Sequence, residues 1–287
     1  MPELMKGQKW TERKHKMTYP AWVEIKHDEI RCHVKVHKDN ADLWHAEFLS
    51  YAGNVLHNMQ AFASKFIDLT KECGFVEFDC GFEVNGNFND SYRWVRSSTG
   101  LPADLIEAPT KFLLFDLPEL DKHTFEQRMQ HRHTVAVLAA TIDFDLFQPA
   151  GGWAHEEGSV ELMFNVARER GYEGLMVKST DHLYERGKRS NGWLKLKPSD
   201  DADGIITELH EAVSEDGTPL GRTGSITIAV EDGSTATPHG IAHELGREMH
   251  EHPERFIGQW AEFKYMERDR QGGYRHPTFN RIREAKQ

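Results

Sequence analysis

Residues 22–36 read Trp-Val-Glu-Ile-Lys-His-Asp-Glu-Ile-Arg-Cys-His-Val-Lys-Val. At the start of this stretch the apolar residues Val23 and Ile25 alternate with polar ones, which is the period of a half-buried β-strand. A short polar turn follows, and apolar residues alternate again from position 32 onward. The stretch therefore predicts two consecutive strands, with Lys26 at the end of the first strand.

The remaining N-terminal part of the chain mixes helical and strand patterns. Apolar residues at helical spacing predict helices over residues 55–69, 124–140 and 159–170. Gly74 and Gly171 follow two of these segments and are typical of a helix end. Runs with strand character cover residues 75–84, 111–117, 172–179 and 192–197. This alternation predicts an α+β fold.

After Pro198 the pattern changes to short apolar runs separated by Gly-rich turns. Strands are predicted at Ile205-Ile206, at residues 225–230 and at residues 260–265, with one helix over residues 241–250. A chain of 287 residues also exceeds the usual size of a single core. We therefore expect two domains, residues 1–199 and 200–287.

The acidic net charge is unevenly distributed. The chain carries a net charge of −11, and the fourteen Asp and Glu against three Arg between residues 200 and 262 account for all of it. Residues 6–38 and 264–286 are locally basic. Such runs are as typical of a solvated face as of a surface that binds phosphate, so they permit a nucleic-acid partner without requiring one.

The composition indicates a globular protein outside the membrane. Hydrophobic residues make up 38% of the chain and charged residues 28%. No apolar run approaches the roughly 20 residues that cross a bilayer. The first ten residues lack the apolar core of a secretory signal, and the three cysteines lack metal-site spacing. These features predict a cytoplasmic protein.

Five blocks in order give Lys26 a chemical meaning that a single lysine would not have. Residues 24–31 resemble the Lys-x-Asp-Gly-x-Arg nucleophile motif of the covalent nucleotidyltransferases. The later blocks resemble their acidic strand, the strand that brings an aromatic ring to the base, their second acidic motif and their paired-lysine strand. These blocks are residues 78–84, 111–117, 173–178 and 193–197.

Within that superfamily the chain is most similar to the small bacteriophage ATP-dependent DNA ligases. Residues 172–206 resemble them almost continuously, and residues 275–286 resemble their C-terminal basic motif. The resemblance implies an ATP-grasp-like nucleotidyltransferase domain of antiparallel sheets and helices, followed by an oligonucleotide-binding (OB) fold, a small β-barrel. It also implies a monomer that seals nicks in double-stranded DNA during replication, repair or recombination.

Two other readings stay open on the residues alone. RNA ligases and GTP-dependent capping enzymes share the lysine chemistry. A nucleic-acid-binding relative with weak catalysis is a second alternative, because two motif positions differ from the family pattern.

The resemblance also implies a role for individual residues. Lys26 would carry AMP, with Asp28 and Arg31 completing the nucleophile motif. Glu24 would face the adenine amino group, and Phe115 would stack on the ring. Mg²⁺ would be held by Glu83 and Glu173. The residues implied to bind ATP are Glu24, Ile25, Lys26, Arg31, Glu83, Phe115, Glu173, Lys178, Lys195, Lys197, Arg283 and Lys286.

The nucleophile has a chemical requirement that the motif must meet. Attack on phosphorus needs a neutral amine, whereas an unperturbed lysine has a pKa of about 10.4. Burial and nearby cations lower such a pKa to roughly 7 to 8. Arg31, Lys195 and Lys197 are the cations that the sequence offers near Lys26.

Several positions depart from the family motifs, among them Tyr51, which follows Ser50 where the family commonly has arginine. Glu29 stands where the family has glycine, which adds a negative charge close to the expected phosphates. Gly81 stands where the acidic strand usually has glutamate. Glu83 lies two residues further, on the same face of that strand, so we expect it to replace the missing acid, with Asp79 as the second choice.

Overall fold

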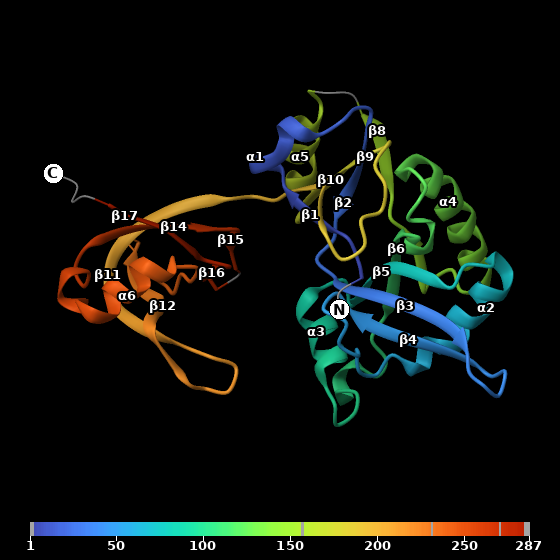
Figure 1. Ribbon diagram of the computed structural model, residues 1–287, viewed down its shortest axis with the longest axis horizontal. Helices are drawn as coiled ribbons and strands as arrows, with labels where there is room; N and C mark the ends of the chain where they lie inside the picture. The colour runs from blue at the N-terminus through green and yellow to red at the C-terminus, as the bar shows by residue number, and fades with distance from the viewer. Residues whose placement is uncertain (1–2, 156–157, 231, 270, 284–287) are drawn as a thin grey trace. The chain divides into compact units, whose positions relative to one another are not determined.

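The computed structural model describes residues 3–155, 158–230, 232–269 and 271–283. The chain divides into two compact units, Met1–Leu196 and Lys197–Gln287 (Figure 1). This division, after Leu196, lies three residues before the boundary after residue 199 that the change in sequence pattern predicts. Among the described residues, no helix combines the length and the apolar character that crossing a membrane requires.

The first sheet of the N-terminal unit has the strand order β1-β10-β9-β2-β8, and all of its pairs are antiparallel except β1 with β10. These strands are Lys6–Lys9, Arg189–Leu196, Gly174–Ser179, Ala21–Lys26 and Gly152–His155. One face packs against α1 (Trp10–Arg13) and α5 (Val160–Glu169) through an apolar cluster that includes Val23 and Leu194. The predicted strand ending at Lys26 is confirmed.

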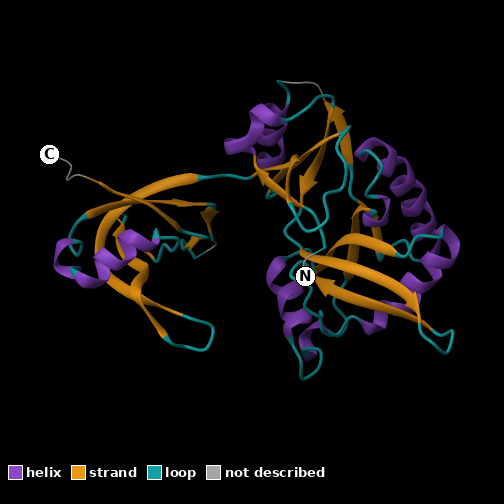
Figure 2. Ribbon diagram, in the orientation of Figure 1, coloured by secondary structure: helices purple, strands orange, loops and turns teal. Residues whose placement is uncertain are grey.

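The second sheet of this unit has the order β4-β3-β5-β6-β7. Its strands are Trp44–Ser50, Ile30–Lys38, Glu77–Val84, Thr110–Asp116 and Phe147–Pro149. One face is covered by α2 (Ala63–Cys73), α3 (Phe88–Arg96) and α4 (Phe125–Ile142), drawn in purple in Figure 2. A phenylalanine-rich core fills the space between them.

One helix prediction needs correction, and one helix was not predicted. The segment predicted as a helix over residues 55–69 begins later, because Val55 forms a bridge to Leu49 and Leu56 donates its N–H to the Phe48 carbonyl. The helix that follows ends at Gly74, as predicted, in the left-handed conformation with φ 78°. Helix α3 was missed, although the Asn87 side chain caps it by accepting the Asp90 N–H.

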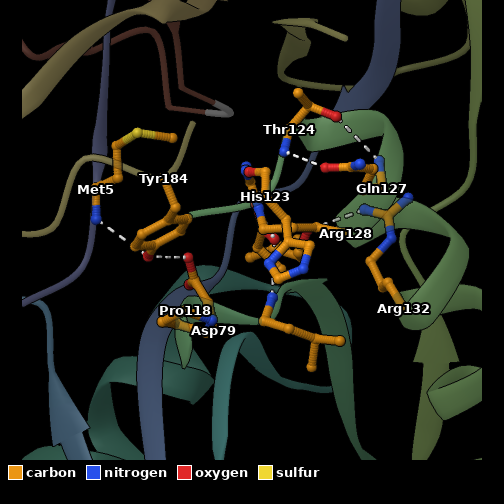
Figure 3. Close-up of polar contacts among 12 residues, drawn as sticks. Met5, Asp79, Pro118, His123, Thr124, Gln127, Arg128, Arg132 and Tyr184 are labelled. Carbon is orange, nitrogen blue, oxygen red and sulfur yellow. Dashed lines mark hydrogen bonds and ion pairs between the residues drawn. The ribbon is translucent and has the colours of Figure 1, made fainter. Parts of the chain in front are cut away.

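Helix α4 begins at a capping box. Thr124 and Gln127 exchange hydrogen bonds between their side chains and backbone N–H groups (Figure 3). The buried positions of the helix are Phe125, Arg128, Arg132, Val135 and Ala139, at spacings of three and four. Two arginines thus lie on the face that the helix turns toward the sheet.

The C-terminal unit contains a five-stranded antiparallel sheet with the order β13-β12-β11-β14-β17. Its strands are Thr235–Ala236, Pro219–Val230, Asp200–Val213, Trp260–Tyr265 and Thr278–Arg283. A small ribbon of β15 (Glu267–Arg268) and β16 (Tyr274–Arg275) and helix α6 (His243–Glu251) complete the unit. The strand predicted only at Ile205-Ile206 is much longer, because polar residues continue β11 on both sides.

Candidate active site

The first sheet gathers polar side chains on the face opposite its apolar cluster. Glu24 of β2 lies opposite Met176 of β9, which lies opposite Lys195 of β10. Lys178 of β9 lies two residues from Met176 on the same strand. Because paired residues and every second residue share a face, Glu24, Lys26, Lys178 and Lys195 all lie on this face.

The second sheet contributes the opposite wall. Arg31 of β3 lies opposite Gly81 of β5, so both turn away from the phenylalanine-rich core. Phe115 of β6 is only partly buried and lies 5.6 Å, measured to its ring centroid, from the Arg31 guanidinium carbon. The same guanidinium lies 5.6 Å from the Trp193 ring of the first sheet. The polar faces of the two sheets therefore meet.

The Lys26 ammonium contacts a carboxylate from a distant part of the chain. It donates hydrogen bonds to Glu173 and, at 3.2 Å, to the His27 carbonyl. The Lys26 side chain is 18% exposed and the Glu173 side chain 5%, so the amine remains accessible while the carboxylate is buried. An accessible amine held by a buried carboxylate can serve as a nucleophile that has a proton acceptor in contact.

Glu24 is buried between two cations. Its Oε1 lies 2.5 Å from Nη1 of Arg132 on α4, and its Oε2 lies 2.5 Å from Nζ of Lys178. Arg132 and Lys178 also donate to the Phe115 carbonyl, at 2.9 Å and 3.4 Å. Burial lowers the pKa of Lys178, while Glu24 opposes that shift by favouring the ammonium. This network ties α4 and the two sheets together behind the site.

Arg31 is anchored by a buried acid. Its guanidinium pairs with both carboxylate oxygens of Asp79, which also accepts the Tyr184 hydroxyl at 2.8 Å. Tyr184 in turn accepts the Met5 N–H at 3.1 Å (Figure 3). Burial disfavours the charged guanidinium, but Asp79 outweighs it and raises the pKa of Arg31 above its usual range. Asp79 therefore orients Arg31 and is not available as a separate ligand.

The acid expected to replace the missing glutamate has other partners. Glu83 is buried, and its oxygens lie 3.2 Å from His27 Nδ1 and 2.8 Å from Lys111 Nζ. Burial works against the charge, but the hydrogen bonds from His27 and Lys111 lower the pKa of Glu83. The side chain that lies over Gly81 belongs instead to Glu29.

Several predicted residues lie at the margin of this arrangement or outside it. Ile25 packs on the apolar cluster of the first sheet, on the face opposite Lys26, so only its backbone borders the site. Asp28 is partly buried in the turn before β3. Lys197 and Arg283 belong to the C-terminal unit. Lys286 lies outside the described residues.

A model of the ATP-dependent DNA ligase domain matches residues 5–197 of the chain. The chain belongs to this family of ligases. The family resemblance drawn from the motifs is thereby confirmed.

The chain is 34% identical to the DNA ligase of Enterobacteria phage T3 over 137 residues, covering 45% of this chain and 38% of that protein. It is 29% identical to the DNA ligase of Escherichia phage T7 over 147 residues, covering 42% of this chain and 40% of that protein. The chain thus spans about two fifths of the length of these curated relatives.

Solved ligase structures share the fold along the whole chain. A structure from a study of DNA binding by Lig E DNA ligases matches with a TM-score of 0.72 at 18% identity, covering 99% of this chain and 100% of that one. The ligase of bacteriophage T7 in complex with ATP matches with a TM-score of 0.55 at 20% identity, covering 98% and 99%. The α+β ligase fold predicted from the motifs is therefore confirmed.

Sequence reasoning missed Arg132 and did not place Glu29 over Gly81. Arg132 had a usable signal, since Arg128 and Arg132 occupy apolar-face positions of an otherwise regular helical pattern. An arginine at such a position needs an acid nearby, because a buried charge without a partner is costly. The sequence shows Glu29 as an added negative charge. Its position over Gly81 depends on how β3 and β5 pair, which local patterns do not predict.

Proposed function

We propose that this chain is an ATP-dependent DNA ligase that seals nicks in duplex DNA through a lysyl-AMP intermediate on Lys26. The observation that carries the proposal is the contact between the Lys26 ammonium and the buried Glu173 carboxylate, on a face shared with Glu24, Lys178 and Lys195. A nucleophilic amine, a proton acceptor and several cations are thereby brought to one site. Charge neutralisation and positioning are what transfer to phosphorus requires.

The first step transfers AMP to the protein. The Lys26 ammonium gives up a proton, for which the Glu173 carboxylate is the acceptor already in contact. The amine then attacks the α-phosphorus of ATP, so that a nitrogen–phosphorus bond forms and the bond to pyrophosphate breaks. Arg31 and Lys195 are proposed to offset the negative charge that develops on the phosphate oxygens.

The base and a metal ion are assigned to neighbouring residues. Phe115, partly exposed beside Arg31, is proposed to stack on the adenine. Mg²⁺ prefers carboxylate oxygens, and when bound it would neutralise phosphate charge. Of the two predicted metal ligands, Glu173 is assigned this role because it contacts the proposed nucleophile Lys26, whereas the Glu83 oxygens contact His27 and Lys111.

The later steps act on DNA. AMP passes from Lys26 to the 5′-phosphate of the nick, and the 3′-hydroxyl then attacks that phosphate and releases AMP. The five-stranded antiparallel sheet of the C-terminal unit supports the proposal that residues 200–287 form an OB-fold that binds the duplex. We further propose that residues 1–199 act as the adenylation domain and that the protein works as a cytoplasmic monomer.

A gel assay tests the activity as a whole. Incubation with ATP, Mg²⁺ and a nicked DNA duplex should join the strands, and intact mass should show one AMP bound to the protein. An adduct formed from GTP but not ATP would favour a capping enzyme. Joining confined to RNA strands would favour an RNA ligase. Duplex binding without any adduct would leave only a binding protein.

A further inference from the structure

Glu29 and Gly81, two of the positions that depart from the ligase motifs, meet in space. A Cβ atom placed on Gly81 would lie 2.4 Å from Cγ of Glu29 and 2.6 Å from Cζ of Phe115. Real Cβ atoms essentially never come so close to other heavy atoms. The Glu29 side chain therefore fills the volume that a side chain at position 81 would take, and glycine at 81 is what makes room for it.

The Glu29 carboxylate reaches this place with an oxygen unused. Its Oε2 has no solvent exposure and no hydrogen-bond partner among the described residues. Burial raises the pKa of the Glu29 carboxyl, while the nearby Lys26 and Arg31 oppose this by favouring the anion. A buried acceptor without a donor is uncommon in native proteins, and a donor from a bound ligand or a water molecule would satisfy it.

Other acids around β5 have their partners within the protein. The two Glu83 oxygens are held by His27 and Lys111, and the Asp79 oxygens by Arg31 and Tyr184. Glu29 therefore differs from both in having an oxygen without a hydrogen-bond donor among the described residues.

The surroundings of Glu29 indicate which part of a nucleotide it would meet. Its Cγ lies beside the Phe115 ring, which is proposed to stack on the base. The positive charge of Lys26, which is proposed to attack the α-phosphate, favours the charged form of its carboxylate. In ATP the ribose lies between the base and the α-phosphate. A ribose hydroxyl is a donor, and it would supply the bond that the carboxylate lacks.

We infer that Glu29 is the acid that replaces the glutamate missing at Gly81 and that its carboxylate accepts a hydrogen bond from a ribose hydroxyl of ATP. This inference rests on the proposed function. It moves the replacement from Glu83, the choice that strand alternation favoured, to a residue on a different segment.

Equilibrium binding of nucleotides without metal tests the inference apart from catalysis. Calorimetry in EDTA would compare ATP with 2′-deoxy-ATP and 3′-deoxy-ATP. The unmodified protein should bind at least one deoxy analogue about tenfold more weakly than ATP. Glu29→Ala should bind that analogue and ATP about equally. Glu47→Ala, which removes an exposed acid on β4, should behave as the unmodified protein does.

A reciprocal exchange makes the test independent of simple damage at position 29. Gly81→Glu alone should weaken ATP binding, because the new side chain collides with Glu29 and Phe115. Combining it with Glu29→Ala removes the collision with Glu29 but not the one with Phe115, so the double variant should recover part of the lost binding together with the sugar preference. Circular dichroism of each variant would establish that the fold is retained.

Three results would overturn the inference while leaving the proposed ligase function intact. These are equal binding of ATP and both deoxy analogues by the unmodified protein, retained sugar preference in Glu29→Ala, or loss of sugar preference in Glu83→Gln instead. Failure of the unmodified protein to bind ATP even with Mg²⁺ present would contradict the proposed function itself.

Discussion

Glu24 and Lys178 form a buried ion pair, with 2.5 Å between Oε2 and Nζ and both side chains 2% exposed. The other Glu24 oxygen pairs with Arg132 from helix α4. One carboxylate thus balances two buried cations. Removing it would leave both cations buried and unpaired, which is far more costly than losing an exposed pair.

We therefore expect Glu24→Ala to lower the free energy of unfolding by about 3–5 kcal/mol. Urea denaturation followed by circular dichroism would measure the change. Glu12→Ala provides the control, because the Glu12 carboxylate pairs with Lys9 at 2.9 Å on the surface and its loss should leave the stability unchanged. Equal changes in the free energy of unfolding for the two substitutions would mean that the buried network stabilises the fold no more than an exposed ion pair does.

A second buried pair predicts a pH dependence. Asp116 accepts bonds from Arg128 Nε at 2.8 Å and Nη2 at 3.0 Å. Burial alone would raise the pKa of Asp116, but Arg128 outweighs it and lowers the pKa below its ordinary value. An acid with a lowered folded-state pKa stabilises the fold above its unfolded pKa, and this contribution is lost as the pH falls toward the folded value.

Asp116→Asn should therefore be most destabilising near neutral pH, by about 3 kcal/mol. The difference from the unmodified protein should begin to shrink below about pH 5 and should keep shrinking below the unfolded pKa of about 3.9, toward the lower folded pKa. Urea titrations across this range would measure it. A difference that stays constant with pH would show that charge on Asp116 is not what stabilises the fold.

Those parts of the fold that depend on local periodicity could be predicted from the sequence. Alternation around Lys26 predicted β2 and β3, and Gly74 marked a helix end, because each pattern reflects one element and the face it buries. What could not be predicted was how elements meet. The partner of Glu24 comes from α4, and the contact of Glu29 with Gly81 depends on strand pairing across many intervening residues.

Substitution of the proposed nucleophile separates chemistry from folding. Lys26→Ala should form no covalent AMP adduct yet keep its fold, since β2 packs into its core through Val23 and Ile25 on the opposite face. Lys26→Arg should fail as well, because a guanidinium keeps its proton and cannot attack phosphorus. Intact mass after incubation with ATP and Mg²⁺ would detect the adduct. An adduct on the Lys26→Ala protein would place the nucleophile elsewhere.

The C-terminal basic motif supports one more prediction. Arg283 pairs with Glu262, with 2.6 Å between Nη2 and Oε2, and with Asp203, with 2.7 Å between Nη1 and Oδ2. Burial opposes the charge on Glu262, but the bonds from Arg283, Arg281 and Asn280 lower its pKa to about 2. Arg283 is therefore held in place as a cation, whereas Lys286, expected to act with it, lies outside the described residues.

We expect Arg283→Ala to slow self-adenylation far more than the sealing of a nick that already carries 5′-AMP. The pyrophosphate leaving group gains negative charge as its bond breaks, and a cation beside it stabilises that transition state. Pyrophosphate is present only in the first step, so the first step alone should lose rate, on the order of 100-fold. Arg281→Ala is the matched control, because Arg281 shares the Glu262 carboxylate at 3.1 Å but is 62% exposed. Single-turnover rates of the two steps, measured separately in both variants, would test this division. A similar loss in both steps of Arg283→Ala would assign the residue to folding or DNA binding, because neither of those roles distinguishes the step that releases pyrophosphate from the step that does not.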